Sequence, residues 1–252
     1  MDDLMPKLND RTAWALFLDI DGTLLDLAPT PCGVIIPPDL PELLEQLEQK
    51  LSGALALISG RSLDDIDRLL GWNGDAAGIH GAQWRRGGHP PVQATALPSS
   101  LIAAITAGAS RLQGIVVEHK PGSAALHFTA VPDRADDVRA LANRMIATAE
   151  VPLRLLHGKG VVEIVPAHAG KGSAIERFMR KPPYVGRRPV FIGDDVTDED
   201  GFAAVNRLGG VSLHVGDSRT AARHRLTSPE AVRRWLTKLN TRLKDGTSHE
   251  LA

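Results

Sequence analysis

Two aspartates stand one residue apart at the end of an apolar run, in the stretch Ala15-Leu16-Phe17-Leu18-Asp19-Ile20-Asp21-Gly22-Thr23-Leu24. On an extended backbone this spacing turns Asp19 and Asp21 to the same side, where each carboxylate raises the pKa of the other. A fold accepts such repulsion where a cation or a proton transfer compensates it. This pattern makes Asp19 a candidate nucleophile and Asp21 a candidate general acid and base.

Polar groups also follow two other apolar runs: Ser59-Gly60 follows 54–58, and Gly193-Asp194-Asp195 follows 190–192. Lys171 stands at the start of a predicted helix. Ligands of open parallel sheets bind beyond the carboxyl ends of the strands, so we expect these groups to converge. The carboxylates would form an oxygen site suited to Mg²⁺, with Lys171 and the Ser59 hydroxyl binding phosphoryl oxygens. The chemistry indicated is phosphoryl transfer.

Each of these features has an ordinary structural interpretation when it is taken alone. Paired aspartates before a glycine can form a solvated turn, Ser-Gly after a strand is usually a turn, and a lysine that begins a helix is usually solvated. The acidic run Asp194-Asp195-Val196-Thr197-Asp198-Glu199 is harder to explain, because it holds more carboxylates than a helix N-terminus needs. The ordered combination at strand ends favours a catalytic site.

The elements that must position these residues alternate between strand and helix. Strands are predicted at 13–18, 54–58, 190–192 and 212–215, and helices after Asp39, after Ser62 and at 171–179. Asp39 and Glu42 have the spacing of a capping box, and Gly71 is expected to end the second helix. This alternation predicts an α/β fold with a parallel sheet between helices.

The middle of the chain has a different pattern. From about 98 to 166 the order is helix, strand, strand, helix, strand, strand, which indicates an α+β layer with an antiparallel sheet. We therefore predict a core domain formed by 1–94 and 167–252, with a cap domain at 95–166 inserted into it.

Composition excludes several classes of protein. The chain has 252 residues, of which 43% are hydrophobic, and a formal net charge of −1. That charge argues against a nucleic-acid binder, and the apolar runs are too short to span a bilayer. Cys32 is the sole cysteine, so no intrachain disulfide can form, and the N-terminus does not resemble a signal peptide. We expect a cytoplasmic protein without nucleic-acid or membrane partners.

The motifs described above, in this order, resemble those of the haloacid dehalogenase superfamily of phosphotransferases. The resemblance implies a Rossmann-like parallel-sheet core with an inserted α+β cap domain. It implies that Asp19 attacks phosphorus to form an aspartyl-phosphate, and that Asp21 protonates the leaving group and then activates water. Mg²⁺ would be bound by Asp19, the backbone carbonyl of Asp21 and Asp194, while Asp198 would orient the metal ligands.

A closer resemblance, to the bacterial trehalose-6-phosphate phosphatases, covers nearly the whole chain. The strings that carry it are Ala54-Leu55-Ala56-Leu57-Ile58-Ser59-Gly60-Arg61, Gly78-Ile79-His80-Gly81-Ala82, Val161-Val162-Glu163-Ile164 and Gly193-Asp194-Asp195-Val196-Thr197-Asp198-Glu199. It implies that Glu118, Lys120 and Glu163 in the cap bind sugar hydroxyls. Further substrate contacts fall to Gly60, Arg61 and His80, and supporting roles to Asp195 and Asp198.

The same cap residues have a second interpretation. Glu118, Lys120 and Glu163 alternate with less polar neighbours, so they also fit the exposed face of a half-buried strand. The family string Leu126-His127-Phe128 continues with arginine in relatives, whereas this chain has Thr129. The resemblance therefore does not extend that arginine's contact to this chain.

The sequence predicts a Mg²⁺-dependent phosphatase that hydrolyses trehalose 6-phosphate to trehalose and phosphate. One alternative keeps the chemistry and changes the substrate to another sugar phosphate, such as sucrose phosphate or mannosylphosphoglycerate. Another is a non-catalytic protein that binds phosphosugars. Loss of Asp19 or Asp21 would indicate this last alternative, and both residues are present.

Overall fold

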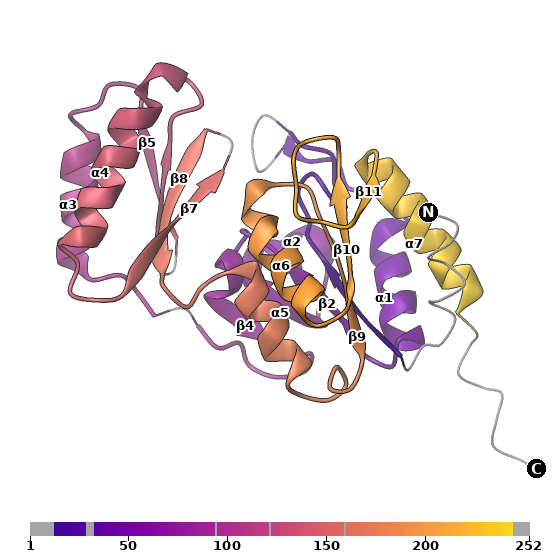
Figure 1. Cartoon of the computed structure of the whole chain (residues 1–252). Coiled ribbons are helices and arrows are strands. Elements are labelled where there is room, and N and C mark those ends of the chain that lie inside the picture. The colour runs from indigo at the N-terminus through magenta and orange to yellow at the C-terminus, as the bar shows by residue number, and fades with distance from the viewer. Residues whose placement is uncertain (1–12, 29–32, 94, 121, 159, 244–252) are drawn as a thin grey trace, which may run out of the picture.

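The computed structural model describes residues 13–28, 33–93, 95–120, 122–158 and 160–243, and these residues form two lobes, each with its own sheet (Figure 1). The strand order of the larger sheet is β11-β10-β9-β1-β2-β3-β4. Its strands are β1 Trp14–Leu18, β2 Leu55–Ile58, β3 Asp75–Gly78, β4 Gln83–Arg85, β9 Arg188–Gly193, β10 Val211–Val215 and β11 His224–Leu226. All neighbours pair in parallel except β3 and β4, which confirms the predicted α/β fold with a parallel sheet.

Helices cover both faces of this sheet. Helices α1 (Leu40–Lys50) and α7 (Pro229–Arg242) lie on one face, and α5 (Lys171–Met179) and α6 (Glu199–Arg207) lie on the other (Figure 1). All residues of the central strands β1 and β2 are buried as a result. This explains why both strands appear in the sequence as continuous apolar runs without polar alternation.

The helix starts predicted after Asp39 and after Ser62 differ in their capping. Ser62 caps α2 (Leu63–Leu70) as expected, because its hydroxyl accepts a hydrogen bond from the Asp65 backbone N–H. The capping box predicted at Asp39 is wrong: Asp39 has helical backbone angles and its side chain makes no cap hydrogen bond. The second residue of α1 is Pro41, which has no N–H, so a capping side chain has one donor fewer to bind.

The smaller sheet lies in the middle of the chain, in the order β5-β6-β8-β7, and all its neighbouring strands are antiparallel. Its elements are α3 Ser99–Ala109, β5 Val116–Lys120, β6 Ser123–His127, α4 Ala135–Ala147, β7 Leu153–Gly158 and β8 Val161–Pro166. This order matches the prediction for 98–166. We call this lobe the cap and the larger lobe the core; the domain boundaries at 94/95 and 166/167 stay a prediction.

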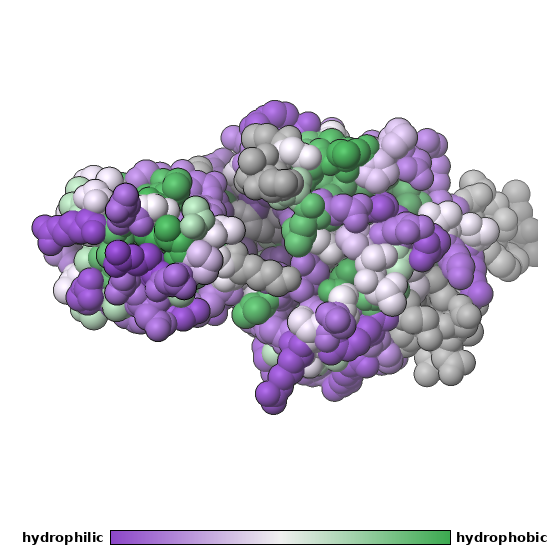
Figure 2. Space-filling view, turned by 90° about the horizontal axis from the view of Figure 1, so that it is seen from above, coloured by the Kyte–Doolittle hydropathy of each residue, from purple (hydrophilic) through white to green (hydrophobic). Residues whose placement is uncertain are grey.

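One face of the cap sheet packs against α3 and α4 around its own hydrophobic cluster, which includes Ile105, Leu126, Val138 and Ile164. Strand residues alternate between faces, so the neighbours of Leu126 and Ile164 point the other way. Viewed from above, the two lobes lie side by side, and the face in view carries mostly hydrophilic residues with apolar patches on both lobes (Figure 2).

Some elements were not anticipated. The strands β3, β4 and β11 were not predicted; β3 consists of Asp-Ala-Ala-Gly, and these residue types have low strand propensity. Cys32 and the N-terminal segment, on which the prediction about compartment depends, lie outside the described residues. In the part of the chain that the structure describes, none of the helices combines the length and apolarity that a membrane span requires.

Candidate active site

The predicted site residues surround a cavity of about 550 Å³ between the carboxyl ends of the core strands and the cap sheet. Most of them line it directly: Asp19, Asp21, Ser59, Gly60, Arg61, His80, Glu118, Lys120, Lys171, Asp194 and Asp195. The other two, Glu163 and Asp198, are buried behind the lining and contact residues in it. The structure thus brings together all the predicted residues, although they come from both lobes.

Lys171 lies between two carboxylates of the core. Its Nζ is 2.7 Å from Asp19 Oδ1 and 2.6 Å from Asp198 Oδ1, and the lysine side chain is 3% exposed. Burial by itself would lower the pKa of Lys171, but the two carboxylates raise it above its ordinary value. Burial also raises the pKa of Asp19, an effect that Lys171 opposes and Asp198 strengthens. The idea that this lysine is a solvated helix-start residue is therefore wrong.

Carboxylate oxygens of Asp19, Asp194 and Asp198 lie within 4.8 Å of one another, which is close enough to hold a metal ion. Gly22 (φ +75°) permits this approach, because a Cβ at that position would lie 2.2 Å from Asp194 Oδ2. Burial, and next the charge of Asp198, raises the pKa of Asp194 to about 6. Three carboxylates face one ammonium group here, so a divalent cation would offset the excess negative charge.

Asp198 does more than the outer orienting role predicted for it. Its Oδ2 accepts hydrogen bonds from the backbone N–H groups of Asp194 and Asp195, and its Oδ1 pairs with Lys171. The carboxylate therefore fixes the loop after β9 and belongs to the acidic cluster at the same time. Its complete burial explains why no solvent competes for these contacts.

We expect divalent cations to stabilise the protein in a pH-dependent manner. A metal ligand must be deprotonated, so the raised pKa of Asp194 predicts that the Mg²⁺-induced rise in Tm is small near pH 5 and grows as the pH passes about 6. When the Mg²⁺ concentration is a hundredfold above Kd, the free energy of unfolding rises by about 2.7 kcal/mol, which corresponds to a rise in Tm of roughly 5–10 °C. Thermal melts with Mg²⁺ and with chelator measure this shift.

The matched variant for that experiment is Asp194→Asn, which removes one carboxylate of the cluster and preserves its size. Its Tm should respond little to Mg²⁺ at any pH. An equal Mg²⁺ response in Asp194→Asn and in the unmodified protein would contradict a metal site at this cluster.

Asp21, the candidate acid and base, is bound by Arg61. The Arg61 Nε and Nη2 atoms donate to the two carboxylate oxygens of Asp21 at 2.7 and 2.6 Å. The Arg61 backbone N–H donates to Ser59 Oγ at 3.1 Å, so the loop after β2 is tied to its own serine. Arg61 was predicted to contact substrate; its side chain lines the cavity and contacts Asp21.

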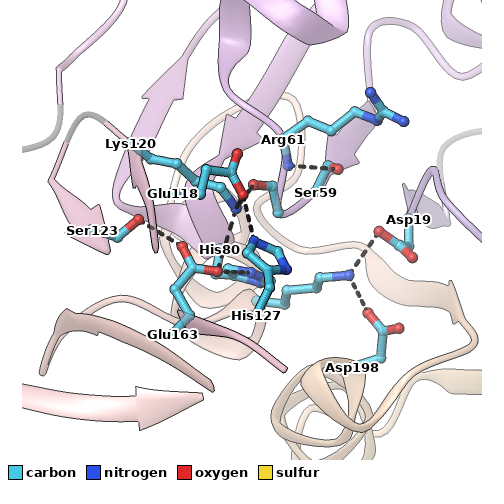
Figure 3. Close-up of polar contacts among 12 residues, drawn as sticks. Asp19, Ser59, Arg61, His80, Glu118, Lys120, Ser123, His127, Glu163 and Asp198 are labelled. Carbon is cyan, nitrogen blue, oxygen red and sulfur yellow. Dashed lines mark hydrogen bonds and ion pairs between the residues drawn. The ribbon is translucent and has the colours of Figure 1, made fainter. Parts of the chain in front are cut away.

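Glu163 is a buried charged residue of the cap, with 5% of its surface exposed. Its Oε1 accepts a hydrogen bond from Ser123 Oγ at 2.6 Å, and its Oε2 lies 3.2 Å from His80 Nε2 and 3.5 Å from Lys120 Nζ (Figure 3). Burial would raise the pKa of Glu163, but these three partners lower it to about 2. The alternative that Glu163 is a plain exposed strand residue is therefore wrong.

Glu118 and Lys120 lie on the same face of the cap sheet as Glu163. Glu118 Oε2 is 2.9 Å from His127 Nε2 and 3.9 Å from Lys120 Nζ. The hydrogen bond with His127 lowers the pKa of Glu118, against the effect of burial. The carboxylates and the ammonium group thus form a polar surface at the cavity that offers both hydrogen-bond acceptors and donors (Figure 3).

Sequence reasoning gave no role to Ser123 or His127. The two residues are four positions apart on β6, so both point to the face that carries Glu163. Strict alternation with Ala124 and Leu126, which are buried among the cap helices, is the signal that could have found them. Thr129, at the position of the family's arginine, is exposed and its hydroxyl donates to Gly160 O at 3.4 Å.

The fold and the site together define a class of protein. A parallel sheet with aspartates after its central strands, a buried lysine between carboxylates and a cap over the cavity are features of haloacid dehalogenase-like phosphatases. The chain belongs to the trehalose-phosphatase family, whose model matches residues 17–230.

Similar proteins agree with this assignment. The chain is 44% identical over 238 residues to the "Probable trehalose-phosphate phosphatase" of Sinorhizobium fredii, covering 92% of this chain and 90% of that one. It is 39% identical over 244 residues to the trehalose-6-phosphate phosphatase of Escherichia coli, covering 95% and 90%. The C-terminal domain of trehalose-6-phosphate phosphatase from C. albicans has the same fold, with a TM-score of 0.78 at 20% identity and coverage of 94% and 96%.

Proposed function

We propose that this protein is a phosphoric monoester hydrolase that converts trehalose 6-phosphate to trehalose and phosphate. The observation that carries the proposal is that residues of both lobes line one cavity. The core side carries the acidic cluster around Asp19, and the cap side carries the polar surface of Glu118 and Lys120. The names of the relatives that are 39% and 44% identical support the substrate.

The chemistry we assign proceeds in two steps. An Asp19 carboxylate oxygen attacks phosphorus, the bond from phosphorus to the sugar oxygen breaks, and Asp21 gives its proton to that oxygen. In the second step Asp21 takes a proton from water, the water oxygen attacks phosphorus, and the bond to Asp19 breaks to release inorganic phosphate. Lys171 stabilises negative charge beside Asp19, where its Nζ lies 2.7 Å from Oδ1.

A magnesium ion is the cofactor we propose, bound by Asp19, Asp194 and the backbone carbonyl of Asp21, with Asp198 beside them. When bound, it would offset the negative charge of phosphoryl oxygens and help to position the phosphoryl group for attack by Asp19. The clustering of three carboxylates supports a hard divalent cation. We also propose that the protein acts in the cytoplasm, because a single cysteine fits a reducing compartment.

In this scheme the cap decides which phosphate ester is hydrolysed. The core groups contact only the phosphoryl part of a substrate, whereas Glu118, Lys120 and Glu163 are available to sugar hydroxyls. A sucrose-phosphatase from Synechocystis shares the fold, with a TM-score of 0.60 at 15% identity and coverage of 92% of this chain and 99% of that one. A likeness at that identity concerns the fold alone and gives no support to a different sugar.

The test is phosphate release from a panel of sugar phosphates and p-nitrophenyl phosphate, with Mg²⁺ and with chelator. We expect metal-dependent release with a strong preference for trehalose 6-phosphate. Glu118→Ala should lower kcat/KM for that substrate about ten- to a hundredfold, because a hydrogen bond to a charged group is lost. It should leave kcat/KM for the aryl ester nearly unchanged, since that ester has no sugar.

Glu150→Ala is the matched control, because Glu150 is an exposed cap residue that does not line the cavity. It should behave as the unmodified protein does. Comparable release from many sugar phosphates would contradict the assigned substrate, and equal losses on both substrates in Glu118→Ala would remove Glu118 from the sugar site.

A further inference from the structure

The loop after β3 lies between the cap sheet and the core segment Ser59-Gly60-Arg61, which we call the phosphate-binding loop because Ser59 is proposed to bind a phosphoryl oxygen. The Ile79 backbone N–H donates to Arg61 O at 2.8 Å, and the His80 backbone N–H donates to Ser59 O at 2.9 Å. The His80 ring covers Gly60, where a Cβ would lie 2.7 Å from Nε2. The segment Ser59-Gly60-Arg61 is therefore held from one side by the backbone and the side chain of this loop.

The backbone of the same loop has an unusual conformation. Ile79 and His80 have φ values of 47° and 51°, in the left-handed region that residues other than glycine rarely adopt. The hydrogen bonds to Ser59 and Arg61 hold this conformation. Ile79 is also fully buried in a small apolar cluster with Val165 from the cap strand β8. Non-glycine residues in such conformations persist where their surroundings fix them, and they concentrate at functional sites.

The side chain of His80 extends this arrangement to the cap. Its side chain is 10% exposed, and Nε2 lies 3.2 Å from Glu163 Oε2. The buried Nδ1 has no hydrogen-bond partner among the described residues. A carboxylate oxygen can only accept a hydrogen bond, so Nε2 carries a proton in this contact. Nε2 then donates to Glu163.

Lys120 completes a closed set of contacts. Its Nζ lies 3.5 Å from Glu163 Oε2 and donates to Gly60 O at 3.4 Å. Gly60 therefore lies against two of the three residues that contact Glu163: the ring of His80 from the core and the ammonium of Lys120 from the cap. Glu163 is therefore connected to the phosphate-binding loop through two side chains.

We propose that His80 is a positioning residue that couples the orientation of Glu163 on the cap to the placement of Ser59 and Gly60 in the core. It acts through these neighbours, because its only described side-chain hydrogen bond is made to Glu163. The inference rests on the proposed function, in which Glu163 binds a sugar and Ser59 a phosphoryl oxygen. Its consequence is that a sugar correctly bound to Glu163 also fixes the loop that binds the phosphoryl group.

Two amide variants test this role as a matched pair. Gln carries its amide nitrogen as many bonds from Cα as His carries Nε2, so His80→Gln keeps a donor for Glu163. Asn is one bond shorter and tolerates the left-handed backbone well, so His80→Asn folds without that contact. We expect His80→Asn to lower kcat/KM for the preferred sugar phosphate about ten- to a hundredfold and His80→Gln to recover most of it. The ratio of this kcat/KM to the kcat/KM for p-nitrophenyl phosphate should fall in His80→Asn and recover in His80→Gln, since the aryl ester has no sugar that could bind Glu163.

Two further variants distinguish a specific positioning role of His80 from a general weakening of the contacts between the cap and the core. In a Glu163→Gln background, His80→Asn should add little further loss, because the two residues act as a unit. Arg154→Ala breaks another contact between cap and core, the 3.1 Å ion pair with Asp200, which does not line the cavity. It should leave sugar discrimination unchanged. The proposal would be overturned if the losses of kcat/KM in His80→Asn and Glu163→Gln were additive, or if His80→Gln did not recover kcat/KM for the sugar phosphate. An equal loss of sugar discrimination in Arg154→Ala would also overturn it.

The same measurements distinguish a failure of the proposed function from a failure of the role proposed for His80. If the unmodified protein prefers another sugar phosphate, the assignment of trehalose 6-phosphate is wrong, and the role of His80 is decided on the preferred substrate. If no sugar phosphate is hydrolysed better than p-nitrophenyl phosphate, no sugar is recognised through Glu163, and the role assigned to His80 is overturned with the function.

Discussion

Asp19→Asn should abolish turnover, with kcat lower by about 10⁴-fold or more, while the protein stays folded. An amide oxygen is a poor nucleophile, so the covalent step at phosphorus cannot proceed. The fold should survive because Lys171 keeps its second partner, Asp198, at 2.6 Å. Phosphate release under saturating Mg²⁺ and thermal melts measure the two effects separately.

Asp136→Asn is the matched control for this substitution, since the Asp136 side chain is 95% exposed on a cap helix. It should leave kcat and Tm close to those of the unmodified protein. A turnover rate in Asp19→Asn near the unmodified rate would exclude Asp19 as the nucleophile. A collapse of Tm in that variant would instead indicate that the lost activity reflects unfolding.

Lys171→Met should destabilise the protein by about 3–5 kcal/mol, because it leaves two buried carboxylates without their cation. For a chain of this size that corresponds to a fall in Tm of about 10 °C. Without the ammonium group the pKa of Asp19 rises further, so the nucleophile is held protonated and activity is lost as well. Chemical denaturation and phosphate release measure the two losses.

The pH dependence of this variant has a definite sign. Carboxylates whose pKa is raised in the folded state bind protons on folding, so the protein loses stability as the pH rises through those values. The deficit of Lys171→Met should therefore be smaller at pH 5 than at pH 8. Adding Asp198→Asn to Lys171→Met removes one of the unpaired charges and should recover part of the lost stability.

Lys238→Met, at an exposed position of α7, provides the control for removing a lysine. It should change the free energy of unfolding by less than about 0.5 kcal/mol. A deficit in Lys171→Met that is the same at both pH values and is not reduced by Asp198→Asn would refute a stabilising ion-pair cluster.

The core of the fold was predictable because its central strands are buried on both faces. Such strands form continuous apolar runs, and each run ends in the residues that the site uses, as β1 does before Asp19. The position of α5 was also predicted, and Lys171 is its first residue. The edge strands β4 and β11 have three residues each, which is too short for a periodic pattern to identify them.

Local patterns in the sequence were enough to indicate phosphoryl transfer, because Asp19, Asp21, Ser59, Lys171 and Asp194 stand at the ends of predicted strands and helices. The partners that hold these side chains could be identified only in the folded chain. His80 and Glu163 are 83 positions apart, and Arg61 and Asp21 are 40 apart. Their pairing depends on how the cap sheet packs against the core and how two strand ends approach each other. Local residue patterns do not encode these distances, so burial, ion pairing and the resulting pKa shifts emerge only in the folded chain.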